Sequence, residues 1–356
     1  MEEVQRKTIL LTGPMGVVGT ALRKRLDRHD LICLAHNDPV EGDRADEVVH
    51  GSVTEPRLGL DSEAYADLAQ RVDAVLHCAA ITDYTASRED MFAVNVGGVQ
   101  RAAGLARDAE AQMFHVSTAF VDAAPIEVDE TKGSRDVKKW WNPDVYLDSK
   151  RAAEDALAES GVPAVVMRPS IVFGDSYTGE TAHFQGMHVL MRLFFESSLP
   201  LMPLDPKRHI DFVPQDVLAD MMAAIIDLPF AARDWWLTSG ERALNLDDLM
   251  RVGTAYLDEI GSPILPPRVV PPDMVDRLIR PVFLPALPAR LRRRFEQLMN
   301  LEPLFFHDGW FKSDLPELEQ VTGTPSDLRL EPAYVAAIAY WLAQKELRKQ
   351  VAEVAI

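Results

Sequence analysis

The sequence is poor in cysteine, in long hydrophobic runs and in the signals of a targeting segment. Two cysteines in 356 residues exclude a disulfide framework. Because Cys33 and Cys78 lie in apolar, strand-like runs, we expect two buried, reduced thiols. No uncharged apolar run of roughly 18 residues occurs, so no membrane-spanning helix is expected. Residues 1–8 lack the apolar centre of a signal peptide, and these absences together predict a cytoplasmic protein.

Positive charge is also scarce. Lysine and arginine number 37 against 55 acidic residues, which gives a net charge of −18 and argues against nucleic acid as a partner. The exception lies between Val275 and Phe295, where Asp276 is the only acid. This segment is interpreted either as a solvated helix face or as a site for a phosphate-bearing or acidic partner. Its arginines are Arg277, Arg280, Arg290, Arg292, Arg293 and Arg294.

Hydrophobic residues are plentiful, at 47% of the chain, and their pattern predicts the fold. Through the first 175 residues, apolar strand candidates alternate with helical patterns. That alternation is typical of an α/β, doubly wound parallel (Rossmann) sheet. The expected strands are Thr8–Thr12, Leu31–Ala35, Glu47–His50, Ala74–His77, Gln112–Ser117 and Ala164–Arg168, and the expected helices are Val17–Arg28, Tyr65–Arg71, Met91–Asp108 and Val145–Ser160.

After residue 174 the alternation weakens, which indicates a smaller, mostly helical substrate domain. We predict a dinucleotide-binding domain over 1–175, with returns to the sheet at about 209–240. A substrate-binding cap is expected over 176–208 and 241–330, and a C-terminal helix over 331–356. Within the cap, apolar residues at helical spacing predict a packed helix or the wall of an acyl tunnel. They are Phe184, Met187, Leu190, Met191, Phe194 and Phe195.

A glycine-rich turn, Thr12–Gly19, follows the first expected strand and leads into a helical pattern. This arrangement directs backbone N–H groups and a positive helix end toward a position where a pyrophosphate can lie. Gly13 permits the tight turn, Gly16 lets a ligand approach the backbone, and Gly19 lets helix and strand pack closely. The turn therefore predicts a dinucleotide site.

Polar side chains at two further places predict the chemistry. Tyr146 and Lys150 are four residues apart and so share one face of a helix. A nearby ammonium, together with the positive nicotinamide ring, favours the phenolate and brings a pKa of about 10 into working range. Thr118, or Ser117, ends the preceding expected strand, where ligands gather in such sheets. We predict that this hydroxyl bonds a carbonyl oxygen while Tyr146 supplies the proton.

In these motifs and their order, the chain resembles the extended short-chain dehydrogenase/reductase superfamily. It is most similar to the branch of fatty acyl-CoA reductases and of the thioester reductase domains that end carboxylic acid reductases and peptide synthetases. The stretch EPRLGL, residues 55–60, is similar to this branch and unlike sugar epimerases. The motifs that carry the resemblance are Thr12–Gly19, Gly51–Leu60, His77–Ala80, Asn95–Gly98, His115–Val121, Tyr146–Lys150, Arg168–Ser176, His209–Asp216 and Trp236–Gly240.

The resemblance implies roles for individual residues. It makes Thr118, Tyr146 and Lys150 the catalytic set, and it implies that Asn95 orders a structural water near the lysine. Histidines and cysteines lack the spacing of metal ligands, so no metal is expected. The implied cofactor-binding residues are Gly13, Met15, Gly16, Val17, Gly19, His36, Ser52, Val53, Ala79, Ala80, Lys150, Pro169, Ser170 and Ile171.

Two positions depart from the family pattern. Ser52 stands where the family usually has an aspartate that binds adenine. At the end of the second expected strand, where an acid selects NAD and an arginine selects NADP, the chain has His36–Asp38. The absence of an acid at His36 favours NADP, with His36 or Arg44 near the 2′-phosphate, whereas Asp38 favours NAD.

These features predict an NADPH-dependent reductase that converts an acyl thioester, carried on CoA or on a carrier protein, to an aldehyde. A second hydride transfer would give the alcohol, and the sequence leaves open whether it occurs. The arginine-rich segment would meet the CoA phosphates or the carrier protein. A nucleotide-sugar epimerase or dehydratase, or a carbonyl or hydroxysteroid reductase, would use the same three side chains. A non-catalytic dinucleotide sensor is a further hypothesis, against which the intact tyrosine and lysine argue. The chain is expected to be a monomer or a homodimer.

Overall fold

A computed structural model describes most of the chain. The described residues are 5–36, 40, 44–122, 143–196, 201–265, 267–270, 282, 284–289, 291–292, 295–296, 305 and 309–354.

A parallel sheet organises the described part of the chain. It has seven strands in the order β11-β6-β5-β4-β1-β2-β3, and every neighbouring pair is parallel. The predicted doubly wound α/β class is therefore confirmed. The strands are β1 (Thr8–Thr12), β2 (Asp30–Ala35), β3 (Glu47–His50), β4 (Ala74–His77), β5 (Gln112–Val116), β6 (Ala164–Pro169) and β11 (Asp234–Leu237).

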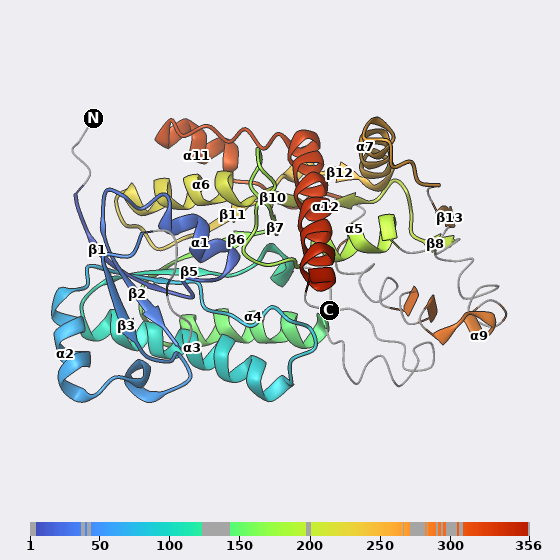
Figure 1. The fold of residues 1–356 in the computed structure, drawn as a ribbon. Helices are drawn as coiled ribbons and strands as arrows, with labels where there is room; N and C mark the ends of the chain where they lie inside the picture. The colour runs from blue at the N-terminus through green and yellow to red at the C-terminus, as the bar shows by residue number, and fades with distance from the viewer. Residues whose placement is uncertain are drawn as a thin grey trace.

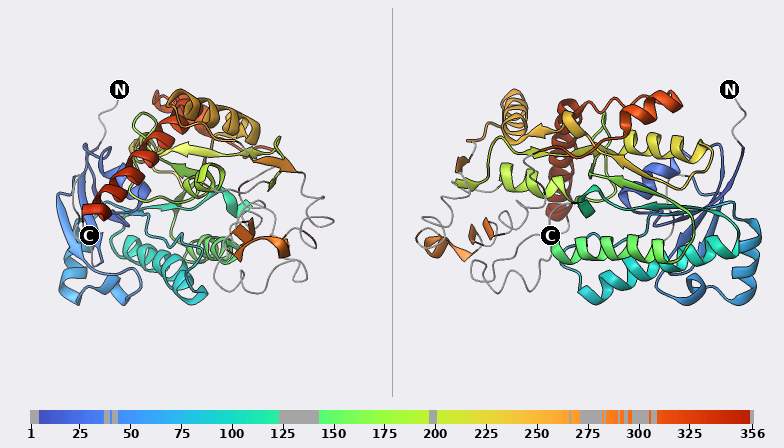
Figure 2. Two further views of the ribbon diagram at one scale, coloured as in Figure 1. Left: turned by 45° about the vertical axis from the view of Figure 1, so that its right-hand side comes forward. Right: turned by 180° about the vertical axis from the view of Figure 1, so that it is seen from behind.

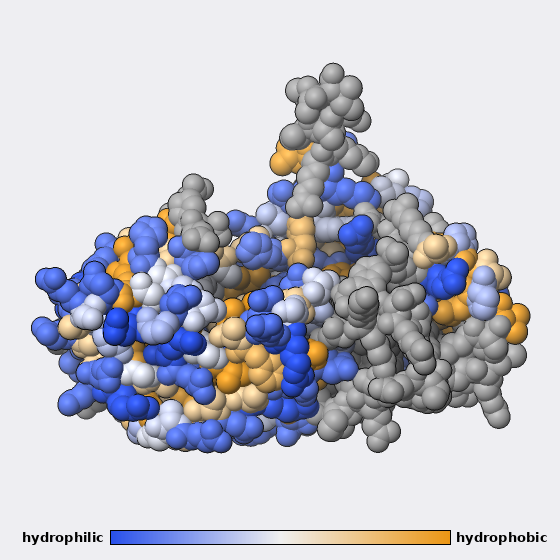
Figure 3. All heavy atoms as spheres, turned by 90° about the horizontal axis from the view of Figure 1, so that it is seen from below, coloured by the Kyte–Doolittle hydropathy of each residue, from blue (hydrophilic) through white to orange (hydrophobic). Residues whose placement is uncertain are grey.

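Helices cover both faces of this sheet (Figure 1). One face carries α2 (Ser62–Arg71), α3 (Arg88–Asp108) and α4 (Pro143–Glu159), and the outer surface of this layer is largely hydrophilic (Figure 3). The other face carries α1 (Val17–Arg23), α6 (Gln215–Asp227) and α11 (Leu315–Thr322). The C-terminal helix α12 (Leu330–Val354) runs between the sheet and the smaller lobe in Figure 1 and in the right-hand view of Figure 2.

Two predicted helix starts were wrong because capping side chains begin these helices earlier. The Asp61 carboxylate accepts hydrogen bonds from the backbone N–H groups of Glu63 and Ala64, so α2 begins at Ser62 rather than Tyr65. The Ser87 hydroxyl accepts from the backbone of Asp90, so α3 begins at Arg88 rather than Met91. In addition, α1 ends at Arg23, five residues before the predicted end at Arg28.

The smaller lobe contains more strand than the sequence predicted. Among the described residues, three two-stranded sheets pair β10 with β7, β12 with β9 and β13 with β8. Strands of two or three residues are too short to show an alternating pattern. These strands are β7 (Ile171–Phe173), β8 (Leu201–Pro203), β9 (His209–Ile210), β10 (Phe212–Pro214), β12 (Leu244–Asn245) and β13 (Arg268–Val270), and the helices of this lobe are α5 (Met187–Glu196), α7 (Leu246–Glu259) and α9 (Leu284–Ala286).

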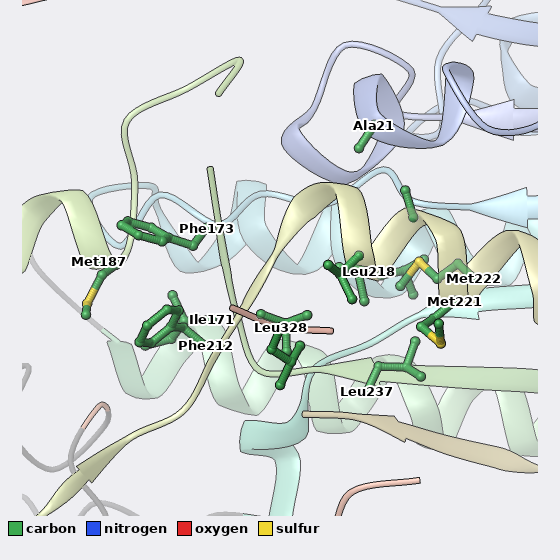
Figure 4. Close-up of a cluster of buried hydrophobic side chains, with 14 of the residues drawn as sticks. Ala21, Ile171, Phe173, Met187, Phe212, Leu218, Met221, Met222, Leu237 and Leu328 are labelled. Carbon is green, nitrogen blue, oxygen red and sulfur yellow. The ribbon is translucent and has the colours of Figure 1, made fainter. Parts of the chain in front are cut away.

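One hydrophobic cluster joins the two lobes. It contains side chains of β1, α1 and α6 and extends without interruption to α5, α7 and α12. Figure 4 shows Ile171, Phe173 and Phe212 grouped near Met187, while Met221 lies farther along the same cluster. Both cysteines carry free thiols, with Cys33 fully buried. Within the described ranges, no helix is long and apolar enough to cross a membrane.

We expect the substitution Phe173→Ala to lower the free energy of unfolding by about 3–5 kcal/mol, because it empties a fully buried site. The Phe173 ring contacts the rings of His188, Phe212 and Tyr334 at centroid distances of 4.9, 5.4 and 6.2 Å. Chemical denaturation would measure the change. Val321→Ala, at a half-exposed position of α11, is the control and should stay within about 0.5 kcal/mol.

Candidate active site

The site lies where the strand order reverses. The chain proceeds from β1 to β2 and β3 on one side, and then crosses to β4 on the other side of β1. At such a point a crevice for a ligand forms outside the carboxyl ends of the strands. The Thr12 hydroxyl joins the two loops, because it accepts hydrogen bonds from the backbone of Cys78 and Ala79, each at 3.2 Å. It also pairs with Nδ1 of His77 at 2.8 Å.

The three glycines of the turn meet different requirements. Gly13 has φ +68°, and a Cβ there would lie 2.8 Å from the Cα of Ala79. At Gly19, a Cβ would lie 2.1 Å from the carbonyl oxygen of Gly13, so the packing of α1 itself demands glycine. At Gly16, the nearest protein atom to a Cβ would be 3.5 Å away. The space beside Gly16 is therefore open, and a side chain at this position would fill it. An open space at the start of helix α1 fits a bound pyrophosphate.

A cavity of about 700 Å³ opens beside this turn. Its size is that of a cofactor or ligand pocket. It joins residues of the glycine turn, of the ends of β5 and β6 and of α4, which are far apart in the sequence. The predicted site residues that line it are Gly16, Val17, Gly19, Ala80, Ser117, Thr118, Tyr146, Lys150, Pro169, Ser170 and Ile171.

The two candidate hydroxyls have different partners. Thr118 lies close enough to Tyr146 to lower the pKa of its phenol, and the Thr118 hydroxyl itself donates to the carbonyl oxygen of Pro169 at 3.4 Å. Ser117 instead donates a hydrogen bond to the Glu154 carboxylate. The sequence left open which hydroxyl serves the phenol, and the geometry favours Thr118.

Burial governs the ionisation of Tyr146. It raises the pKa of the phenol to about 12, and the nearby Thr118 side chain opposes the rise. We expected Lys150 to bring this pKa into the neutral range. In the structure, desolvation dominates, so the phenol stays protonated at neutral pH and is a hydrogen-bond donor.

Lys150 is 3% exposed, and its Nζ donates to the carbonyl oxygen of Val116 at 2.9 Å. Burial lowers the pKa of this ammonium to about 8, while the negative charge of Glu154 acts in the opposite direction. His77 and His115 stack nearby with ring centroids 5.6 Å apart. Burial, followed by the charge of Lys150, lowers the pKa of His77 to about 3 and that of His115 well below its usual range. Both rings are therefore neutral, and Lys150 carries the local positive charge.

Asn95 connects the segment after β4 to helix α4 through side-chain hydrogen bonds. Its Oδ1 accepts from the backbone N–H of Ile81 at 2.7 Å, and its Nδ2 donates to the Ile81 carbonyl and to the Ser149 hydroxyl, at 3.1 and 2.8 Å. These bonds tie the segment after β4 to the helix that carries Lys150. The implied role of Asn95 in ordering a water stays a prediction.

The EPRLGL stretch forms a tight turn beside the loop after β3. A short 3₁₀ turn, Pro56–Gly59, directs the Leu58 carbonyl toward the backbone N–H of Ser52, at 2.7 Å. The Ser52 hydroxyl pairs with that of Thr54 at 2.8 Å, and Arg101 donates to the carbonyl of Val53 at 3.4 Å. The turn thus shapes the loop on which the predicted adenine contact would lie.

The region of the predicted 2′-phosphate contact differs from expectation at Arg44. The guanidinium of Arg44 donates to the carbonyls of Leu26 and His29, at 2.8 and 2.5 Å, and pairs with Asp46 at 2.6 Å. It is therefore held by the protein, and its predicted role near the phosphate is not supported. His36 lies exposed at the end of β2. Asn37 and Asp38 lie outside the described residues, as do the arginines of the arginine-rich segment apart from Arg292.

Sequence reasoning missed two residues of this site. The Tyr84 ring meets the Tyr146 ring edge-on, with centroids 5.6 Å apart, and it lines the cavity. It lies in an irregular segment after β4, where no periodic signal exists. Glu154 did carry a signal, since it follows Lys150 at the same spacing of four at which Lys150 follows Tyr146.

Comparisons with known proteins agree with this arrangement. Residues 13–222 match the family model described as male sterility protein, an NAD-binding family. A stretch of 183 residues is 29% identical to the hybrid PKS-NRPS synthetase pvhA of Talaromyces variabilis, covering 49% of this chain and 4% of that protein. A stretch of 217 residues is 29% identical to the glycine betaine reductase ATRR of Emericella nidulans, covering 49% of this chain and 16% of that protein. The chain thus matches only a small part of these much longer relatives.

Solved structures share the fold. The terminal R domain from the myxalamid PKS-NRPS biosynthetic pathway superposes with a TM-score of 0.72 at 21% identity, covering 97% of this chain and 92% of that one. The reductase domain of a nonribosomal peptide synthetase from Mycobacterium tuberculosis gives a TM-score of 0.63 at 22% identity, with coverages of 95% and 92%.

The glycine turn can be tested with a matched pair of substitutions. Gly16→Ala should weaken dinucleotide binding by roughly tenfold or more with little change in thermal stability, because the added methyl enters the open space and not the protein. Gly19→Ala should lower the free energy of unfolding by about 2 kcal/mol, since its methyl meets backbone. Cofactor fluorescence titration and thermal melts would measure the two effects. Unchanged dinucleotide affinity in Gly16→Ala would contradict the assignment.

Proposed function

The chain belongs to the male sterility protein family, within the extended short-chain dehydrogenases/reductases, and we propose that it is an NADPH-dependent reductase that converts an acyl thioester to an aldehyde and a free thiol. One observation carries this proposal. A single cavity joins Gly16 of the turn to the hydroxyls of Thr118 and Tyr146 and to the Lys150 ammonium. This combination can hold a nicotinamide cofactor and stabilise negative charge on a carbonyl oxygen.

The cofactor would supply a hydride to the thioester carbonyl carbon. The residues of the chain act on the oxygen. The hydroxyls of Thr118 and Tyr146 donate hydrogen bonds to it as negative charge develops, and a protonated phenol suits this task. In a second reduction, from aldehyde to alcohol, Tyr146 gives its proton to the oxygen. The Lys150 ammonium would orient the cofactor by donating hydrogen bonds to the hydroxyls of the nicotinamide ribose.

The apolar side chains that line the cavity favour an acyl group as the substrate. The aromatic and aliphatic side chains of Ile171, Phe184, Val189 and Phe305 line the same cavity as Thr118, Tyr146 and Lys150. An apolar wall favours an acyl chain over a sugar, which would need many polar partners. The relative pvhA and the two similar solved structures are named for polyketide or nonribosomal peptide synthesis. We therefore propose that the acyl group arrives on a phosphopantetheine arm, either of a carrier protein or of CoA.

We propose NADP as the preferred cofactor. His36 lies exposed at the end of β2, where a histidine can donate a hydrogen bond to a 2′-phosphate. The family pattern has a discriminating residue at this position, and a ring N–H donor there, in place of a carboxylate, favours the additional phosphate over a bare ribose.

Replacing Tyr146 by Phe tests the proposed acid. We expect kcat for the NADPH-dependent reduction of an acyl-CoA to fall by about 10²–10⁴-fold, because the ring stays in place while the donor is lost. The control is Tyr65→Phe on helix α2, which removes a phenol that donates a hydrogen bond to Asp108 at the end of α3. It should leave turnover unchanged. Equal turnover in Tyr146→Phe and the wild type would refute the assignment.

The substitution His36→Asp tests the proposed cofactor preference. A carboxylate beside the 2′-phosphate should lower the ratio of kcat/KM for NADPH to that for NADH by roughly tenfold through charge repulsion. The effect should weaken at high ionic strength. If the ratio stays constant, His36 does not face the phosphate.

A further inference from the structure

Helix α4 carries a regular series of ionisable side chains. Tyr146, Lys150 and Glu154 follow one another at intervals of four residues, so they lie in a row along one face of the helix. The row begins at the cavity, which Tyr146 and Lys150 line. At its other end, Glu154 accepts hydrogen bonds from Nε and Nη2 of Arg168, at 3.0 and 2.6 Å, and one from Ser117.

The row continues toward solvent through Arg168. Nη1 of Arg168 lies 2.7 Å from the carboxylate of Asp234. The charges therefore alternate in sign from Lys150 through Glu154 and Arg168 to Asp234. The exposed fractions of these four residues are 3%, 16%, 15% and 47%, so the series joins a buried ammonium to the surface.

We propose that Glu154 is a positioning residue that keeps Lys150 in its charged form within the buried site. An ammonium taken out of water tends to lose its proton unless a negative charge lies nearby. Arg168 and Ser117 fix the Glu154 carboxylate one turn from Lys150, where it supplies that charge. The consequence for turnover rests on the proposed function, whereas the effect on Lys150 itself does not.

The other groups around Lys150 do not supply a negative charge. From β4, His77 is neutral, and burial raises the pKa of the Cys78 thiol to about 12. From β5, His115 is neutral, and from α4, Tyr146 is protonated. Even with Glu154 present, burial lowers the pKa of Lys150 to about 8. Loss of the negative charge of Glu154 would lower this pKa further, toward neutral pH.

The test is a titration of Lys150 by NMR in the full chain, with lysine labelled at the ε-carbon and no cofactor added. The Lys150 resonance is identified by its absence in Lys150→Arg. Glu154→Gln keeps the shape and the hydrogen-bond acceptor but removes the charge, so the midpoint should fall by roughly one pH unit. The control is Asp155→Asn, which removes the same charge from an exposed neighbour on α4 and should leave the midpoint unchanged.

An unchanged midpoint in Glu154→Gln, or an equal shift in Asp155→Asn, would overturn the proposal. If Glu154→Gln does not fold, Arg168→Gln is the second test. It removes the cation that compensates Glu154, so the midpoint should rise, and the absence of a rise would likewise overturn the proposal.

The pH dependence of turnover adds a readout that a purely structural role would not move. The charged form of Lys150 is lost as pH rises, so kcat/KM of Glu154→Gln should match the wild type at low pH and decline at a lower pH than the wild type does. A uniform loss at all pH values would contradict the proposal. A shifted midpoint in a chain that reduces no thioester would instead refute the proposed function and leave the role of Glu154 intact.

Discussion

The site depends on the close approach of two backbone segments, the loop after β1 and the loop after β4. Thr12 bonds Cys78 and Ala79 across the gap, and Gly13 has no space for a side chain against Ala79. This contact fixes one end of the crevice at the reversal of strand order. The hydrogen bonds of one continuous sheet position the ends of β5 and β6 relative to it. The Lys150 ammonium ties α4 to the end of β5 through the carbonyl oxygen of Val116.

Burial then sets the protonation of this crevice. Burial disfavours the charged form of each group, so it raises the pKa of the Tyr146 phenol and lowers the pKa of the Lys150 ammonium. The result at neutral pH is a neutral donor beside a cation, which suits stabilisation of an oxyanion. The same low polarity neutralises His77 and His115, which lie behind the site and add no competing charge.

The sequence predicted those parts of the fold that repeat over many residues. The strands of the sheet are short apolar runs that alternate with helical patterns, and their positions were predicted to within about two residues. The starts of α2 and α3 were missed because a cap, such as Asp61 or Ser87, is a single side chain that acts on the local backbone. The choice between Ser117 and Thr118, and the presence of Tyr84 in the wall, depend on contacts between distant segments. No spacing within one segment encodes them.

The continuous hydrophobic cluster has a consequence for how substrate range can change. Leu22 of α1, Met221 of α6 and Tyr334 of α12 belong to the same core, so the smaller lobe cannot be exchanged or displaced as a separate module without exposing the face of the sheet. For the proposed acyl substrate, a change in range would come from replacing individual side chains such as Phe184 or Val189 on the cavity surface. Diversification by point substitution, and not by swapping of lobes, is the evolutionary route that this packing leaves open.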